Sequence, residues 1–183
     1  GLAVVDLSTG DFSLDEGPSD QLEDELQRQG PTELLLAEGA AEDWVKRLGV
    51  ILPKAAVSRL EDWHFEYQHA YETLTQQLKV HSLKGFDCED MEMGVRAAGA
   101  VVGYLRDNQR GAVDHINRIR RQRRGDYLFI DATAQRNLEL LTNQQDGGRE
   151  GSLLDVIDRT LTPMGARLLR LWVVAPLKGA KAI

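Results

Sequence analysis

One helix near the C-terminal end of the sequence has almost no polar face. Residues 162–177 read TPMGARLLRLWVVAPL. Thr162 predicts an N-cap, because its hydroxyl can accept a hydrogen bond from a free N–H of the first turn. Pro163 suits the first helical position, and the Ala175-Pro176 pair predicts the end. Six of the seven residues from Leu168 to Val174 are apolar, so this helix should need protein on nearly all sides.

The chain ends nine residues after Val174, which leaves little sequence to cover such a helix. We therefore expect a fragment of a larger protein, and a first residue of Gly rather than Met agrees with this. In the fragment alone, the helices after Gly125 should be poorly packed or paired with a second copy. Truncation of Trp172 is predicted to cost ~3–5 kcal/mol, an estimate that requires a buried side chain. The alternative is a terminal helix that closes the core of a small domain.

Length, composition and charge narrow the class of protein. A chain of 183 residues with 42% hydrophobic and 28% charged residues is typical of a soluble protein with one or two domains. No apolar run approaches the ~18 residues of a membrane span, and no signal peptide is recognisable. The single cysteine, Cys88, excludes an internal disulfide and fits a cytoplasmic location. Residues 1–50 hold 12 Asp/Glu against 3 Lys/Arg, which is a poor DNA surface. A solvated face is favoured over contact with a basic partner.

The first sixty residues alternate between extended and helical patterns. Two extended runs around Gly10 predict a β-hairpin. Further strands are predicted over 33–37 and 55–60, with helices over 18–29 and 41–48 before each of them. Strand–helix–strand order predicts an α/β fold, and we expect an RNase H-like domain with a mixed sheet and flanking helices over residues 1–115.

From about Trp63 the hydrophobic period becomes helical. Its first stripe is made by Tyr67, Tyr71, Leu74 and Leu78. At ~100° per residue, Gln76 lies opposite this stripe and Gln77 on its flank. Both amides are therefore expected on the outward side of the helix.

A longer helix is predicted over 87–107, with Asp87 as its N-cap. Its glycines Gly94, Gly99 and Gly103 should weaken it, but they also permit another element to approach closely. We expect this helix to pack on the sheet.

The segment after this helix differs in composition. Residues 110–124 hold six Arg against one Asp, and we place the domain junction there. The arginines are Arg118, Arg120, Arg121, Arg123 and Arg124, together with Arg110. No aromatic residue is interleaved for base stacking, so pairing with the acidic first third is favoured over nucleic-acid contact.

Residues 125–183 are predicted to be an all-α domain. Asp131 should cap a helix that runs to about Leu141, and residues 143–151 form a loop by composition. Ser152 and Asp155 have capping-box spacing before the next helix.

Catalytic patterns are weak. Asp6 stands at the end of the first strand, where a divalent-metal nuclease of the RNase H superfamily would hold a carboxylate, and Glu38 is the other candidate. The favoured role for Asp6 is in a strand-to-turn junction, where its side chain bonds the backbone two residues on. The histidines are not spaced as metal ligands, and nucleophile signatures are absent. A binding or scaffold module is favoured over a catalyst, with the nuclease as the alternative.

Four stretches of the sequence resemble the MutS family of DNA mismatch-repair proteins. The first is the hairpin motif D-x-S-T-G-x-F, with Asp6 and Gly10. The second spans Gly85-Phe86, Ala98-Gly99, Tyr104-Leu105 and Gln109. The third contains Asp131 and Arg136-Asn137-Leu138-Glu139-Leu140. The fourth contains Thr162, Pro163, Met164, Gly165, Arg167, Leu169, Trp172 and Pro176.

The resemblance implies a non-catalytic connector domain followed by the beginning of the helical core, or lever, domain at 125–183. It implies no cofactor in this part, since ATP and Mg²⁺ would be bound only by the full-length protein. The implied partners are MutL, the remaining MutS domains and, through the full-length protein, mismatched DNA, with no membrane. The resemblance also implies that the connector is a docking surface for MutL, to which Gln76 and Gln77 would belong. The alternative for this amide pair is an ordinary exposed helix surface.

Overall fold

The computed structural model describes residues 1–108, 113–122, 127–128, 130 and 132–179. They divide between two compact units, Gly1–Gln122 and Arg123–Ile183. The expected cap Asp131 and the arginines Arg123 and Arg124 lie outside the described residues. Among the described helices, none is long and apolar enough to cross a membrane.

The first unit begins with the predicted hairpin. Strands β1 (Leu2–Asp6) and β2 (Asp11–Asp15) pair antiparallel, with Val4 opposite Ser13. A two-residue strand, β5 (Arg120–Arg121), pairs parallel with β2. The sequence predicts a domain junction here and no strand, because two residues are too few to show an alternating pattern.

Strands and helices then alternate as predicted. Helix α1 (Ser19–Gln29) precedes β3 (Glu33–Ala37), and α2 (Glu42–Ile51) connects β3 to β4 (Ala56–Leu60). Strands β3 and β4 are parallel, as a helical crossover requires. The unit is therefore a mixed α/β fold. Within the described residues its strands form two sheets, β1-β2-β5 and β3-β4, where a single mixed sheet was expected.

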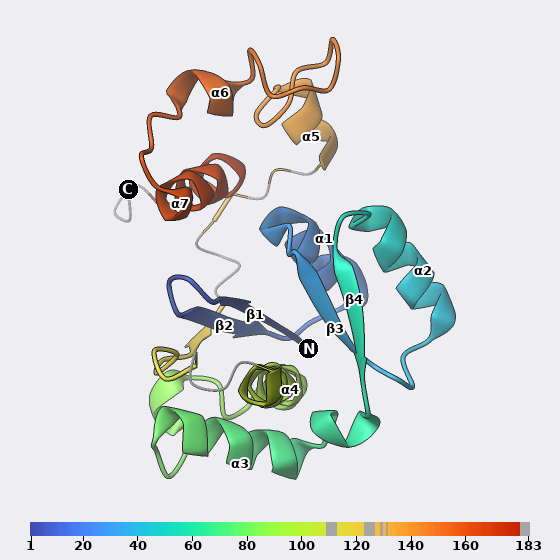
Figure 1. Cartoon of the computed structure of the whole chain (residues 1–183), viewed down its shortest axis with the longest axis vertical. Coiled ribbons are helices and arrows are strands. Elements are labelled where there is room, and N and C mark those ends of the chain that lie inside the picture. The colour runs from blue at the N-terminus through green and yellow to red at the C-terminus, as the bar shows by residue number, and fades with distance from the viewer. Residues whose placement is uncertain (109–112, 123–126, 129, 131, 180–183) are drawn as a thin grey trace. The chain divides into compact units, whose positions relative to one another are not determined.

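Two packed helices complete this unit. A short 3-10 turn, η1 (Asp62–Phe65), leads into α3 (Tyr67–Leu78), and a second, η2 (Lys84–Phe86), precedes α4 (Glu92–Asn108). Helix α4 lies between α3 and the hairpin (Figure 1). The core between them contains Phe12 and Leu14 from the hairpin, Leu74 from α3, and Val95 and Val102 from α4. Packing on the hairpin sheet confirms the predicted role of the long helix.

The start of α4 differs from the prediction. Asp87 follows η2 in the left-handed region, with φ 57°, and is not the N-cap of α4, which begins at Glu92. Asp tolerates this conformation better than most residues, because its short side chain can bond locally. An aspartate after a short turn is therefore ambiguous in sequence.

The second unit has three helices among its described residues. They are α5 (Ala132–Asn137), α6 (Leu153–Ile157) and α7 (Pro163–Val174). Helix α5 ends four residues before the predicted Leu141, because Glu139 adopts φ 49° and turns the chain. Near the two ends of this unit, the Leu128 N–H donates to the Pro176 carbonyl at 2.8 Å.

Candidate partner-binding surface

The two assigned glutamines of α3 occupy different environments. Gln76 is exposed, as predicted. Gln77 is buried, with 9% of its surface exposed, so its predicted outward position is wrong. The buried face of α3 consists of Ala70, Thr73, Leu74, Gln77 and Leu78. Ala70 and Thr73 lie seven and four residues before Gln77 and therefore share its face of the helix. They could have indicated that this face is buried, but small and polar residues mark a buried face less clearly than large apolar ones.

Gln77 makes three hydrogen bonds in its buried position. Its amide nitrogen Nε2 donates to the Val113 carbonyl at 2.8 Å and to the Ile116 carbonyl at 3.0 Å. Its amide oxygen Oε1 accepts from Nε of Arg106 at 3.0 Å. Gln77 therefore ties α3 both to α4 and to the segment after α4.

A half-open pocket of about 240 Å³ lies beside Gln76. Residues of η1, α3 and α4 line it: Trp63, His64, His69, Glu72, Thr73, Gln76, Gly103, Arg106 and Asp107. Sequence reasoning missed this pocket because the residues of η1 and α4 that form it are far apart in the chain.

Aromatic rings form one wall of the pocket. The Trp63 and His64 rings are stacked with centroids 3.7 Å apart, and His69 meets Trp63 edge-on at 4.9 Å. Trp63 is still 48% exposed. The Nδ1 atom of His64 is buried without a hydrogen-bond partner among the described residues and faces Gly103. An exposed tryptophan beside polar groups is typical of surfaces that bind other proteins.

The hairpin motif has a structural role in the turn. Oδ1 of Asp6 accepts from the N–H of Ser8 at 2.8 Å and from that of Thr9 at 3.3 Å, which confirms the predicted turn bonding. Gly10 adopts φ 74°, and a Cβ there would lie 3.1 Å from the His115 carbonyl oxygen. This turn therefore requires glycine.

The nuclease alternative gains no support from this geometry. Glu38 follows β3, whereas Asp6 ends β1, and these two strands belong to different sheets. Within the described parts of the chain, no group of three or more His, Cys, Asp or Glu side chains is arranged to hold a metal ion.

The predicted cap of α7 is confirmed. Oγ1 of Thr162 accepts from the N–H of Gly165 at 3.1 Å, and Pro163 occupies the first turn. A Cβ on Gly165 would lie 3.2 Å from that same Oγ1, which is a tight contact. Asn137 ends α5, and its carbonyl accepts from the side chain of Gln144 at 3.2 Å.

Helix α7 leaves several of its large apolar side chains exposed. Trp172 is 59% exposed, so the estimate for a fully buried tryptophan is wrong for this structure. Met164 and Leu168, at i−8 and i−4 from Trp172, are also exposed, and Val174 is the helix's one buried residue. This agrees with the expectation that the helix is poorly packed within this chain.

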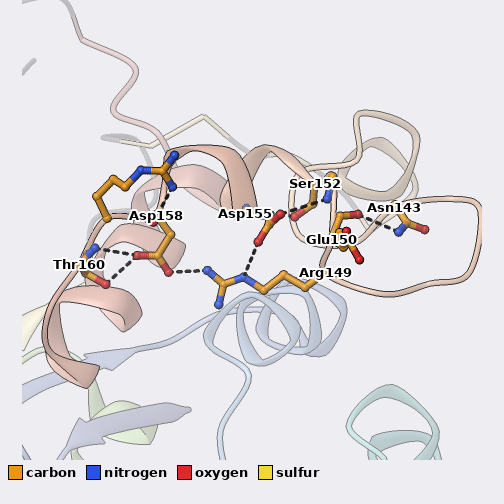
Figure 2. Close-up of polar contacts among 9 residues, drawn as sticks. Asn143, Arg149, Glu150, Ser152, Asp155, Asp158 and Thr160 are labelled. Carbon is orange, nitrogen blue, oxygen red and sulfur yellow. Dashed lines mark hydrogen bonds and ion pairs between the residues drawn. The ribbon is translucent and has the colours of Figure 1, made fainter.

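A polar network connects residues of the segment between α5 and α7, which includes α6 (Figure 2). Oδ1 of Asp158 accepts from the hydroxyl and N–H of Thr160 at 2.7 and 3.0 Å, and its other oxygen pairs with Arg149. The Thr160 hydroxyl and N–H, together with Arg149, lower the pKa of Asp158 to about 2. Ser152 caps α6 by accepting from the N–H of Asp155 at 3.2 Å.

One part of the arginine-rich segment pairs with the acidic first third. Arg120 binds the carboxylate of Asp11 through two hydrogen bonds of 3.0 and 2.7 Å. Arg121 lies 3.4 Å from Asp90, and Arg118 is exposed.

Comparison with known proteins covers almost the whole chain. Residues 1–117 match the family model "MutS domain II", and residues 133–183 match "MutS domain III". The DNA mismatch repair protein MutS of Salinibacter ruber is 40% identical over 178 residues, which are 97% of this chain and 19% of that protein. The MutS protein of Symbiobacterium thermophilum is 40% identical over 187 residues, which cover 100% of this chain and 21% of that protein.

The chain thus spans about a fifth of the length of the curated relatives it matches. Its first unit carries the match to domain II, and the match to domain III falls within the second. From both matches and the level of identity, the chain belongs to the MutS family of DNA mismatch-repair proteins, and corresponds to its connector domain and the beginning of its core domain.

Proposed function

We propose that this chain acts as a non-catalytic coupling module of a cytoplasmic mismatch-repair protein. Residues 1–115 form an RNase H-like connector, and residues 125–183 form the beginning of the lever domain. The module joins the mismatch-binding part of the whole protein to its ATPase part. ATP, Mg²⁺ and mismatched DNA are bound by the full-length protein.

The connector also offers a docking surface for MutL. The observation that carries this proposal is the exposed Gln76 beside a pocket that contains the half-exposed Trp63. An uncharged amide can donate and accept hydrogen bonds without the cost of desolvating a charge. A tryptophan contributes a large apolar area at low cost in conformational entropy.

The test is the Gln76→Ala variant. Alanine has the higher helix propensity, so α3 should remain intact, while affinity for MutL should fall several-fold. Gln27→Ala is the matched control, because Gln27 is likewise an exposed glutamine on a helix, in α1. The two variants should have equal thermal stability, and only Gln76→Ala should weaken binding. Equal MutL affinity for both variants would refute the assignment of Gln76.

A further inference from the structure

We propose that Arg106 is the charged anchor of the docking pocket, and that it receives an acidic side chain of the protein partner. Gln77 acts on binding through Arg106, as a positioning residue without contact to the partner. This inference rests on the proposed docking of MutL to this surface.

The orientation of the Gln77 amide is determined by its neighbours. Two backbone carbonyls, those of Val113 and Ile116, require the two hydrogens of Nε2. Oε1 is then left to accept, and it accepts from Nε of Arg106 at 3.0 Å. Since a buried amide with all its donors satisfied cannot rotate without losing hydrogen bonds, it holds the guanidinium in one place.

Arg106 retains donors for a partner. With Nε engaged by a neutral oxygen, the two terminal nitrogens of the guanidinium remain, and they form no ion pair with another described residue. The side chain lines the pocket and is half-buried. A partner that covers Arg106 removes water from its guanidinium group. The charge of that group then needs a hydrogen-bond acceptor from the partner. Guanidinium and carboxylate groups pair in a bidentate geometry.

The surrounding charges favour a protein side chain over a phosphate backbone. Glu72 and Asp107 are exposed members of the same lining. These two carboxylates leave the lining without the excess of positive charge that a row of phosphates needs, whereas a single carboxylate needs only the guanidinium of Arg106. The exposed ring of Trp63 then offers an apolar surface for the methylene groups of a Glu or Asp side chain. Tryptophan and arginine are both enriched at binding hot spots.

The experiment measures affinity for purified MutL, and its dependence on salt, for variants of the whole chain. Arg106→Ala should weaken binding by about tenfold or more. Arg106→Lys should weaken it by less, because lysine keeps the positive charge but loses the planar pair of N–H donors. The slope of affinity against salt concentration should fall for Arg106→Ala, since one charge contact is removed. Arg47→Ala is the control, because Arg47 is an exposed arginine on α2 that pairs with Glu23. It should leave MutL affinity unchanged.

A double-mutant cycle tests the role of Gln77. Gln77→Ala alone should weaken MutL binding several-fold, but in the Arg106→Ala background it should cause no further loss. Additive losses would show that Gln77 contacts the partner itself and would overturn the positioning role. Circular dichroism accompanies each variant, and if Gln77→Ala does not fold, the affinity and salt slope of the Arg106 variants decide the proposal.

The failures of the two proposals are distinguishable. If the unmodified chain does not bind MutL, both the proposed docking and this inference are refuted. If it binds MutL and Arg106→Ala binds equally well, this inference alone is refuted. Binding of a single-stranded oligonucleotide that depends on Arg106, with MutL binding unaffected, would assign the pocket to nucleic acid instead.

Discussion

Replacing Gly99 with alanine should have opposite effects on the helix α4 and on the folded protein. Within an isolated helix, alanine is more favourable than glycine by about 1 kcal/mol. In the structure, however, a Cβ on Gly99 would lie 2.3 Å from both Cα and Cβ of Ala70 in α3. Real contacts between carbon atoms are about 3.5–4.0 Å, so the two helices would have to separate by more than 1 Å.

Backbone atoms cannot avoid this clash by changing rotamer. Overpacking of a tight core typically costs about 1–3 kcal/mol, and a contact with a Cα atom belongs at the upper end of that range. Subtracting the gain in helix propensity leaves a net loss of about 2 kcal/mol in the free energy of unfolding.

Gly103→Ala is the matched control for this prediction. Gly103 lies one turn further along α4, and its Cβ would meet only Nδ1 of His64, at an ordinary 3.7 Å. This variant should be neutral or more stable by up to about 1 kcal/mol. Urea unfolding followed by far-UV circular dichroism measures both variants against the unmodified chain. If Gly99→Ala is as stable as Gly103→Ala, then α3 and α4 do not cross closely at Gly99, and the reasoning is refuted.

Four further predictions concern other parts of the chain. Thr162→Ala should cost ~1 kcal/mol of stability in the second unit through loss of the α7 cap. Trp172→Ala should cost no more than about 1 kcal/mol because the side chain is 59% exposed, and a loss near 3 kcal/mol in urea unfolding would show that it is buried in solution. The pKa of Asp158 is lowered to about 2 in the folded state, so its stabilising contribution is present above its ordinary pKa of 3.8 and is lost as the pH falls from about 4 toward 2. Asp158→Asn should reduce the loss of stability between about pH 4 and pH 2, and an unchanged loss would argue against the network of Figure 2. Finally, the chain should not nick supercoiled DNA with Mn²⁺, and nicking abolished by Asp6→Asn would revive the nuclease alternative.

Several local features of this fold could be predicted from the sequence, although Asp87 was wrongly predicted as the N-cap of α4. The hairpin turn of Asp6 and the caps of Thr162 and Ser152 involve groups two or three residues apart. Such contacts depend on residue type and local backbone geometry alone, so their signatures are legible in one sequence. The parallel pairing of β3 with β4 was also predictable, because a helix connects them.

The tertiary structure decided which of several possible faces is buried. Gln77 and Trp172 show this in opposite directions, because a glutamine predicted on the outside is buried and a tryptophan assumed to be buried is exposed. Periodicity identifies the faces of a helix, but burial depends on which distant segment packs against each face. The segment that covers Gln77 lies 36 and 39 residues away in the chain. Strand β5 and the pocket of Trp63 and Arg106 also depend on contacts between residues far apart in the chain. Such contacts leave no repeating pattern in the sequence of either segment.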